Sequence, residues 1–352
     1  MLARYKVFLA MLAASMFFYV MNNAPASDAE ADSTAGLNFD DTLLDVPLEY
    51  PDWFKLSLGD FRDDLDEAVK NGKNGLIIYF GQKRCAYCEQ FFETNLAAAD
   101  TERYIRTHYD MIPIDIWGIE NITDTDGKQY TERELAVHYK TNFTPSLVFY
   151  DNKGKPVFRL RGYYPPYKFK AALKFVVEGF YKEETFREYL ERAEPGMFFM
   201  AGGLNERDFF VEPPYDLQKL SADRSKPLVV FFEQGECHTC DLLHTGPLNK
   251  ADALEEIAQM NAVQLDMWAD TPVITPEGEK TTARDWANKL GLFYPPTLLF
   301  FDPDGKEIIR LDSVIQFYRL WGVLDYMNRQ GYKTEMDYQA WRLKQRKVIN
   351  QK

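Results

Sequence analysis

The cysteines are the residues whose type and spacing point most directly to chemistry. All four cysteines of this 352-residue chain lie in two C-x-x-C pairs, Cys85 with Cys88 and Cys237 with Cys240. Each pair follows an apolar run typical of a buried strand and precedes a segment with helical spacing. A cysteine just before a helix lies at the positive end of the helix dipole, which favours its thiolate. The pattern therefore predicts two thiol–disulfide exchange sites, with Cys85 and Cys237 as nucleophiles and Cys88 and Cys240 as resolving residues.

The two pairs belong to a repeat of the whole chain at an offset of 151 or 152 residues. The apolar run 76–80 falls on 228–232, and Asp115-Ile116-Trp117 falls on Asp266-Met267-Trp268. Further along, TPSLVFYDNKGK from Thr144 falls on PPTLLFFDPDGK from Pro295. Solenoid units have roughly 20 to 50 residues, so a repeat of this length indicates two domains.

The sequence pattern of each copy predicts the same order of elements, namely strand, C-x-x-C, helix, strand, helix, hairpin and closing helix. In the first copy we expect strands at 75–80 and 111–117, helices at 88–108 and 131–140, and a hairpin of 146–150 with 156–160. Two βα units followed by a hairpin predict an α/β fold with a mixed central sheet flanked by helices. The expected domains are residues 46–194, with the motif CAYC, and residues 195–352, with the motif CHTC.

This order of elements resembles the thioredoxin superfamily, and in detail the SoxW-type periplasmic thioredoxin-related proteins. The motifs that carry the resemblance are CAYC at 85–88, TPSLVF at 144–149, DNKGK at 151–155 and RLRGY at 159–163. It covers almost all of 50–190 and, more weakly, 225–345. It implies two tandem thioredoxin-like domains without a cofactor or metal, each with an insert between the C-x-x-C helix and a strand that a cis proline opens. The implied cis prolines are Pro145 and Pro296, and the implied substrate contacts are Thr144, Pro145, Pro295 and Pro296.

Two features depart from that family. Thioredoxins carry a buried acidic residue six positions before the first cysteine, where this chain has Tyr79 and Phe231, so proton handling must differ. The second copy also has Pro295 where the first has Thr144, and it has His238 inside its C-x-x-C motif. The substrate contacts of the second copy therefore need not match those of the first.

Charges near the cysteines predict unequal sites. Residues 82–90 include Lys83 and Arg84 and have a net charge of +1, whereas residues 233–241 have a net charge of −3 with His238 neutral. Cations favour a thiolate and carboxylates oppose it, so Cys85 should be the more acidic of the two attacking thiols. Lys83, Arg84 and His238 are the candidate redox-tuning residues, although His238 also fits a metal ligand or an exposed histidine.

Other interpretations of these motifs remain open. The four cysteines could form one zinc site, or two inert structural disulfides. The second domain could have lost redox activity and serve as a docking or chaperone module. The aromatic run 163–169 fits either packing at a helix start or a docking face for a partner, and Trp117 and Trp268 fit packing in the core or in the insert.

The composition and the N-terminal segment bear on location. The chain has 41 Lys and Arg against 54 Asp and Glu, a net charge of −13, which argues against a nucleic-acid surface. Residues 1–26 combine Arg4 and Lys6 with an apolar run from Val7 to Met21, which predicts a cleaved signal peptide or an N-terminal membrane anchor. Residues 27–45 have the small, acidic composition of a flexible tether. We expect the rest of the chain to be periplasmic or otherwise exported.

These expectations combine into a predicted function. The chain should be an exported thiol–disulfide oxidoreductase that acts on disulfides of exported proteins, with a membrane thiol reductase as its electron donor. The resemblance implies a reductase or isomerase in preference to an oxidase, because CAYC with Thr144 before the cis proline is similar to reducing and isomerising members. The alternative is a non-enzymatic module that binds an exported partner or a copper client through its thiols. Contact with a membrane is expected only through the N-terminal segment.

Overall fold

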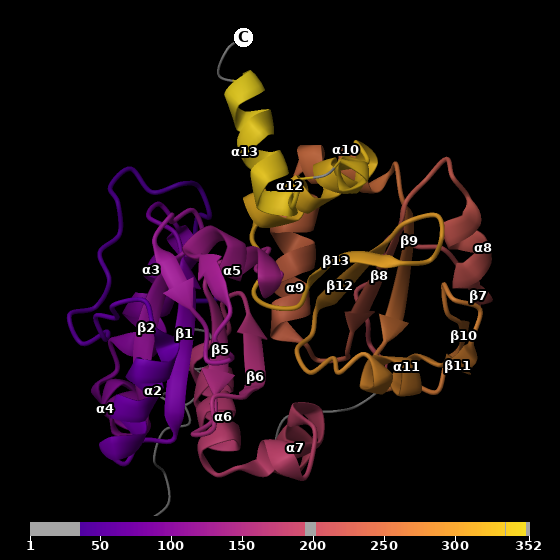
Figure 1. Ribbon diagram of the computed structural model, residues 1–352. Coiled ribbons are helices and arrows are strands. Elements are labelled where there is room, and N and C mark those ends of the chain that lie inside the picture. The colour runs from indigo at the N-terminus through magenta and orange to yellow at the C-terminus, as the bar shows by residue number, and fades with distance from the viewer. Residues whose placement is uncertain (1–35, 194–201, 335, 350–352) are drawn as a thin grey trace, which may run out of the picture.

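The computed structural model describes residues 36–193, 202–334 and 336–349. The predicted signal or anchor segment 1–26 and the predicted boundary at 194/195 lie outside the described residues. Within these ranges two α/β domains stand side by side, and one helix of the second domain, α9 (His238–Thr245), lies between the two sheets (Figure 1). Among the described residues, no helix combines the length and the hydropathy that a membrane span requires.

The first domain is built on a four-stranded mixed sheet in the order β2-β1-β5-β6. β1 (Gly75–Gly81) runs parallel to β2 (Tyr109–Asp115) and antiparallel to β5 (Ser146–Tyr150), which forms a hairpin with β6 (Pro156–Arg161). All seven residues of β1 are buried, because helices cover both faces of this central strand. β3 (Asn121–Thr123) and β4 (Gln129–Thr131) form a small hairpin inside the predicted insert.

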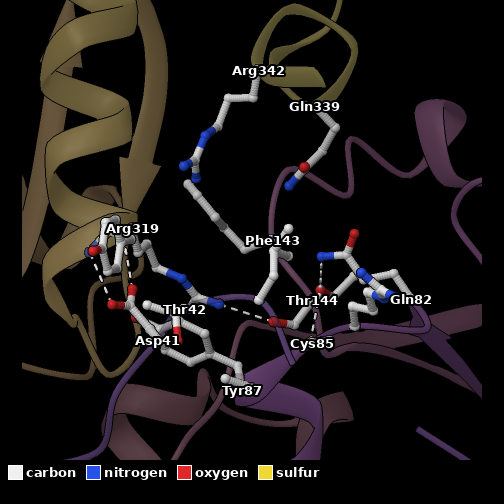
Figure 2. A pocket seen from close by; sticks show the side chains of 14 residues that line it. Asp41, Thr42, Gln82, Cys85, Tyr87, Phe143, Thr144, Arg319, Gln339 and Arg342 are labelled. Carbon is white, nitrogen blue, oxygen red and sulfur yellow. Dashed lines mark hydrogen bonds between the residues drawn. The ribbon is translucent and has the colours of Figure 1, made fainter. Parts of the chain in front are cut away.

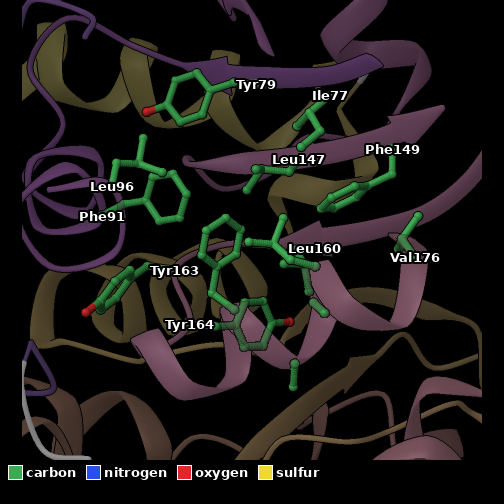
Figure 3. Close-up of a cluster of buried hydrophobic side chains, with 14 of the residues drawn as sticks. Ile77, Tyr79, Phe91, Leu96, Leu147, Phe149, Leu160, Tyr163, Tyr164 and Val176 are labelled. Carbon is green, nitrogen blue, oxygen red and sulfur yellow. The ribbon is translucent and has the colours of Figure 1, made fainter. Parts of the chain in front are cut away.

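Helices cover the two faces of this sheet in two groups. One group packs on the face that carries Ile77 and Tyr79, and it consists of α3 (Ala86–Phe91), α4 (Ala99–His108), α6 (Pro166–Val177) and α7 (Phe186–Ala193). Figure 3 shows part of the buried cluster of aromatic and aliphatic side chains on this face. α2 (Phe61–Lys70) and α5 (Glu132–His138) pack on the face that carries Ile78 and Phe80, as the alternation of side chains along a strand requires. A 3₁₀ turn, η2 (Phe180–Lys182), joins α6 to α7.

The single helix predicted for 88–108 is two helices. α3 continues into a π-helical turn, η1 (Phe92–Leu96), and Ala98 is extended before α4 begins. The buried Asn95 in the π-helical turn donates a hydrogen bond to the carbonyl oxygen of Tyr164 (3.1 Å). This tertiary contact gives no signal in the apolar periodicity, so the interruption was not predicted.

The second domain repeats the architecture with the sheet order β13-β12-β8-β9. Its strands are β8 (Leu228–Glu233), β9 (Asn261–Asp266), β12 (Thr297–Phe301) and β13 (Glu307–Leu311), and a smaller sheet joins β7 (Tyr215–Asp216), β10 (Pro272–Ile274) and β11 (Lys280–Thr282). Its helices are α8 (Leu217–Ala222), α9 (His238–Thr245), α10 (Ala251–Ile257), α11 (Ala283–Lys289), α12 (Phe317–Asn328) and α13 (Tyr338–Ile349), with 3₁₀ turns η3 (Pro247–Asn249) and η4 (Gly331–Lys333). The prediction of two tandem α/β domains with mixed sheets is confirmed.

The two domains meet at loops that are equivalent in the repeat, the one before α6 and the one before α12. Arg161 pairs with Asp312 (3.1 Å), and the backbone N–H of Val314 donates to the carbonyl oxygen of Tyr163 (3.0 Å). Between these contacts Gly162 approaches Ser313 so closely that a Cβ on Gly162 would lie 2.1 Å from Ser313 Oγ. Three successive positions thus contact their own repeat equivalents, as residues do at a two-fold axis.

Aromatic and cationic side chains extend this interface. Tyr164 is buried and packs against Phe293 and Tyr294, with ring centroids 5.5 and 5.3 Å apart. The buried Arg187 of α7 lies over the Trp268 ring at 3.8 Å and donates to the carbonyl oxygen of Leu292 (3.0 Å). The aromatic run 163–169 therefore packs at the start of α6 and also against the other domain.

Part of the segment predicted as a flexible tether packs against both domains. Leu37 is buried in the core of the first domain, and its carbonyl oxygen accepts a hydrogen bond from Gln316 Nε2 (2.7 Å). The Asp41 carboxylate accepts the backbone N–H groups of Tyr318 and Arg319 in the first turn of α12 (2.9 and 2.8 Å). Acidic residues in this segment suggested a solvated tether. Asp41 instead caps the N-terminus of α12, where a carboxylate is favourable. We call residues 36–43 the N-terminal strap.

Candidate redox sites

The first C-x-x-C pair is a disulfide at the start of α3. Cys85 is the N-cap residue, and its Sγ accepts a hydrogen bond from the backbone N–H of Cys88 at 3.0 Å. The free amides of a helix start therefore face the sulfur, an environment that favours a thiolate after reduction. The side chains are close to fully buried, with 4% of Cys85 and 1% of Cys88 exposed.

The loop that opens β5 lies against Cys85. The Thr144–Pro145 bond is cis, and Thr144 Oγ1 lies 3.2 Å from Cys85 Sγ. Gln82 Nε2 donates to Thr144 Oγ1 (3.1 Å), and Trp117 Nε1 donates to Gln82 Oε1 (3.1 Å). Because a disulfide sulfur carries no proton, the Thr144 hydroxyl is the donor to Cys85. A chain of three hydrogen bonds thus runs from the Trp117 indole to the sulfur.

Sequence reasoning missed Gln82 and assigned Trp117 to packing. Trp117 does pack, with the Arg133 guanidinium 4.5 Å from its ring, but its indole N–H also orients Gln82. The same pair recurs in the second domain, where Trp268 Nε1 donates to Gln234 Oε1 (2.9 Å). Recurrence of both residue types at the repeat offset is the signal that could have found them.

Cys85 opens into a cavity of about 70 Å³ that both domains build (Figure 2). The strap contributes Asp41 to its wall, α12 contributes Arg319, and α13 contributes Gln339 and Arg342. A wider groove of about 960 Å³ shares several of these lining residues and extends past Trp117. The sulfur therefore faces a small opening beside this wider groove.

The second domain also contacts Tyr87, which lies inside the first C-x-x-C motif. Tyr87 is buried, its hydroxyl oxygen accepts from the backbone N–H of Gln316 (2.8 Å), and its hydroxyl donates to Asp41 (3.3 Å). Burial raises the pKa of Tyr87 well above its usual range, so the phenol keeps its proton for Asp41. The Arg319 guanidinium covers the Tyr87 ring at 3.2 Å, and its Nη2 donates to the carbonyl oxygen of Thr144 (2.9 Å).

The second C-x-x-C pair has the same frame with a different hydroxyl. Cys237 and Cys240 form a disulfide at the start of α9, and Cys237 Sγ accepts the backbone N–H of Cys240 (3.1 Å). The Pro295–Pro296 bond is cis. Thr239 donates its hydroxyl proton to the carbonyl oxygen of Pro295 (2.8 Å), while its Oγ1 lies 3.3 Å from Cys237 Sγ. Here the hydroxyl proton is directed at a carbonyl and not at the sulfur.

The three candidate tuning residues are all exposed. Arg84 lines both the small cavity at Cys85 and the wider groove, whereas Lys83 lines only the groove. His238 is the first residue of α9 and lies at the surface beside Cys237. Of the three, the structure places Arg84 at the cavity that reaches a sulfur.

A buried carboxylate lies near the second pair, although not at the position usual in thioredoxins. Glu233 ends β8, is fully buried, and accepts hydrogen bonds from His244 Nε2 (2.8 Å) and Gln264 Nε2 (3.0 Å). His244 follows Cys240 by four residues on α9, so the two side chains share one helix face. The first domain has Gly81 at the position of Glu233. Considering only the sixth position before each cysteine left this pair undetected.

Two C-x-x-C disulfides, each at a helix start and each beside the loop that opens an inner strand of a four-stranded sheet, define a protein of the thiol–disulfide oxidoreductase kind. The chain belongs to the thioredoxin-like domain family, whose model matches residues 61–177 and 214–328. These two matches confirm the tandem thioredoxin-like pair. The narrower resemblance to SoxW-type proteins stays a prediction.

Several of the solved structures similar to the chain each correspond to about one domain. A thioredoxin-fold protein from Helicobacter pylori is 27% identical, with 36% of this chain and 82% of that chain covered and a TM-score of 0.31. A thioredoxin from Thermus thermophilus is 25% identical, with coverages of 37% and 95% and a TM-score of 0.29. A DsbH oxidoreductase is 19% identical, with coverages of 38% and 92% and a TM-score of 0.27. No curated protein matches the chain.

Proposed function

We propose that this protein is an exported enzyme that exchanges thiols and disulfides with other proteins, as a reductase or isomerase. The observation that carries the proposal is the placement of Cys85 Sγ. It caps α3, lies 3.2 Å from the Thr144 hydroxyl, and opens into a cavity that adjoins a wider groove. Helix amides and a hydroxyl donor both stabilise the thiolate that attacks a client disulfide.

The reaction consists of two successive thiol–disulfide exchanges, in each of which one S–S bond breaks and one forms. The Cys85 thiolate attacks one sulfur of the client disulfide, so the client S–S bond breaks and a mixed disulfide forms. The first client sulfur leaves as a thiolate and takes a proton from solvent. Cys88 then loses its proton and attacks Cys85 Sγ, which releases the second client thiol and closes the Cys85–Cys88 disulfide. The client gains two electrons and the protein loses two.

A reductase must regain those two electrons from another thiol protein. The proposed donor is a membrane thiol reductase, because an exported compartment is oxidising and offers few soluble reductants. Export rests on the pattern of residues 1–26. The preference for reduction or isomerisation rests on the resemblance of CAYC and Thr144 to members of that kind.

The geometry at Cys85 limits the form in which a client can enter. A cavity of about 70 Å³ holds a few waters or one small side chain, and it is bounded by the strap and by α12 and α13 of the second domain. A flat folded surface does not reach the sulfur. Clients therefore present their disulfide on an extended or locally unfolded segment that lies in the adjoining groove.

Reduction of insulin by the pre-reduced full chain with a regenerating thiol tests the proposal. We expect multiple turnovers, a lower turnover rate with Cys85→Ala, and accumulation of a mixed disulfide with Cys88→Ala. The double variant Cys237→Ser/Cys240→Ser shows how much the second site contributes. If the protein instead binds one insulin molecule per thiol pair without further turnover, the proposed enzymatic activity is wrong and the non-enzymatic binding module is supported.

A further inference from the structure

We infer that Arg319, contributed by the second domain, is a positioning residue for the first redox site. It holds the Thr144 loop against Cys85 and places a buried positive charge there, so that the Cys85–Cys88 disulfide is easier to reduce. The inference rests on the proposed function only in taking the first site to be redox-active. It makes one domain a determinant of the redox equilibrium of the other.

The contacts of Arg319 converge on the first site. Its Nη2 donates to the carbonyl oxygen of Thr144 (2.9 Å), and the hydroxyl of that same residue lies 3.2 Å from Cys85 Sγ. Its guanidinium also covers the Tyr87 ring at 3.2 Å, within the C-x-x-C helix. Figure 2 shows Arg319 reaching from the second domain to the Thr144 carbonyl across Tyr87. Only one residue therefore separates this cation from the reacting sulfur.

The position of Arg319 in its own helix is unfavourable unless such contacts compensate. Arg319 is the third residue of α12, where a cation opposes the helix dipole, and only 4% of it is exposed. Burial lowers the pKa of Arg319, but an arginine in a protein keeps its charge. Its repeat equivalent, Lys168, is the third residue of α6 and is also buried. A buried cation at this place in both domains indicates a use beyond packing.

Several other charged or titratable side chains line the same cavity. They are Asp41 from the strap, Arg84 and Tyr87 from the C-x-x-C segment, Tyr318 from α12 and Arg342 from α13. Arg84 is exposed, so solvent screens its charge. The Asp41 carboxylate opposes a thiolate, but it is already engaged by two amides of α12 and by the Tyr87 hydroxyl. Arg319 is the buried cation of this set.

The direction of the effect follows from charge alone. Reduction of the disulfide by two glutathione thiols gives Cys85 and Cys88 as thiols, with glutathione disulfide as the oxidised product. A cation beside Cys85 stabilises its thiolate and so stabilises the reduced protein relative to the disulfide. Arg319 thereby makes the reduction potential of the Cys85–Cys88 disulfide less negative. The first site becomes a weaker reductant and better suited to isomerisation.

Equilibration with glutathione tests this in the full chain carrying Cys237→Ser/Cys240→Ser, so that only the first site reports. With Arg319→Met we expect the equilibrium to shift about tenfold toward the disulfide, the effect of one unit charge through a single intervening residue at an effective dielectric of roughly 20 to 40. This is about 30 mV toward a more negative potential. The pH midpoint of Cys85 alkylation should rise together with that shift.

Arg319→Lys keeps the charge and should stay within about threefold of the parent. Arg329→Gln removes an exposed arginine from the C-terminal end of the same helix and should leave the equilibrium unchanged. If Arg319→Met does not fold, the comparison of Arg319→Lys with Arg319→Gln replaces it. An equilibrium within twofold of the parent in Arg319→Met, or an equal shift in Arg319→Lys, would overturn the inference. Insulin turnover is measured separately from the glutathione equilibrium. Failure of the proposed function can therefore be told apart from failure of the inference about Arg319.

Discussion

The direction of one hydroxyl proton is a difference between the two redox sites at the scale of residues. In the first site the Thr144 hydroxyl receives a hydrogen bond from Gln82 and directs its own proton at Cys85 Sγ. In the second, the Thr239 hydroxyl donates its proton to the carbonyl oxygen of Pro295. Hydrogen bonds donated to a sulfur stabilise its anion, so the two sites differ in the same direction as their local net charges.

We predict that Cys85 is the more acidic attacking thiol, by about one pKa unit. Rates of alkylation with iodoacetamide against pH measure this in two full-length proteins, one with Cys237→Ser/Cys240→Ser and one with Cys85→Ser/Cys88→Ser. A thiol reacts as its anion, so the rate rises as the pH passes the thiol pKa, and limited access lowers the plateau without moving the midpoint. A midpoint for Cys237 equal to or below that for Cys85 would contradict the prediction.

Thr144→Val should raise the pKa of the reduced Cys85 thiol, because it removes the hydroxyl donor and nearly preserves the side-chain volume. We expect a rise of about one unit, the size of one hydrogen bond to a charged acceptor. Thr239→Val is the matched control at the second site, where the hydroxyl proton points to a carbonyl. The same alkylation profiles report both variants. Equal shifts at the two sites would show that the direction of the proton is unimportant.

The sequence predicted the cysteines and the prolines of the sites but not what surrounds them. Cys85 and Thr144 were found because the repeat and the family motifs mark them directly. Arg319 and Tyr87 were missed because their role depends on contact between domains, which no spacing within either copy encodes. Lys83 and Arg84 were chosen by proximity in sequence, yet both are exposed, and the buried cation at the site comes from residue 319.

At the scale of elements, apolar pattern predicted the strands well and the helices in part. β1 and the β5–β6 hairpin lie where continuous apolar runs and the turn at 151–154 placed them. The predicted helix 88–108 is interrupted near Asn95, whose side chain donates a hydrogen bond to the carbonyl oxygen of Tyr164 in the loop before α6. Local pattern locates elements whose side chains pack within their own layer, whereas it does not detect polar contacts between layers.

The loop before α6 carries a glycine that the domain interface requires. Gly162 has φ +87°, and a Cβ there would lie 2.1 Å from Ser313 Oγ. We predict that Gly162→Ala lowers the free energy of unfolding by about 2–3 kcal/mol, of which about 1 kcal/mol reflects the positive φ. Gly72→Ala is the matched control, since Gly72 has φ +79° and a Cβ there would meet no heavy atom within 4 Å. Urea unfolding should show a larger loss of unfolding free energy for Gly162→Ala than for Gly72→Ala. Equal losses would mean that the interface rearranges to accommodate the added methyl group.

At the scale of the whole molecule, each half carries a four-stranded sheet with an apolar cluster on either face, and the other half adds only a few side chains to two of these clusters, among them Tyr294 and Phe143. We predict that residues 36–193 and 202–349, expressed separately, each unfold cooperatively in urea. Each should be less stable than the full chain, because separation exposes aromatic side chains such as Tyr164 and Tyr294. Mixed halves should form a one-to-one complex by sedimentation. A half without a cooperative transition would show that the domains fold only together.

The pair of Arg161 with Asp312 has a consequence for how the protein is assembled. In a dimer of identical chains, a residue on the two-fold axis meets its own copy, so two arginines or two aspartates would face each other and repel. Here equivalent positions carry opposite charges and lie 3.1 Å apart. This contact forms only between two different domains, one with the arginine and one with the aspartate. A tandem chain contains one of each in every molecule. The interface thus selects the pairing of one half with the other and disfavours symmetric association of either half with itself.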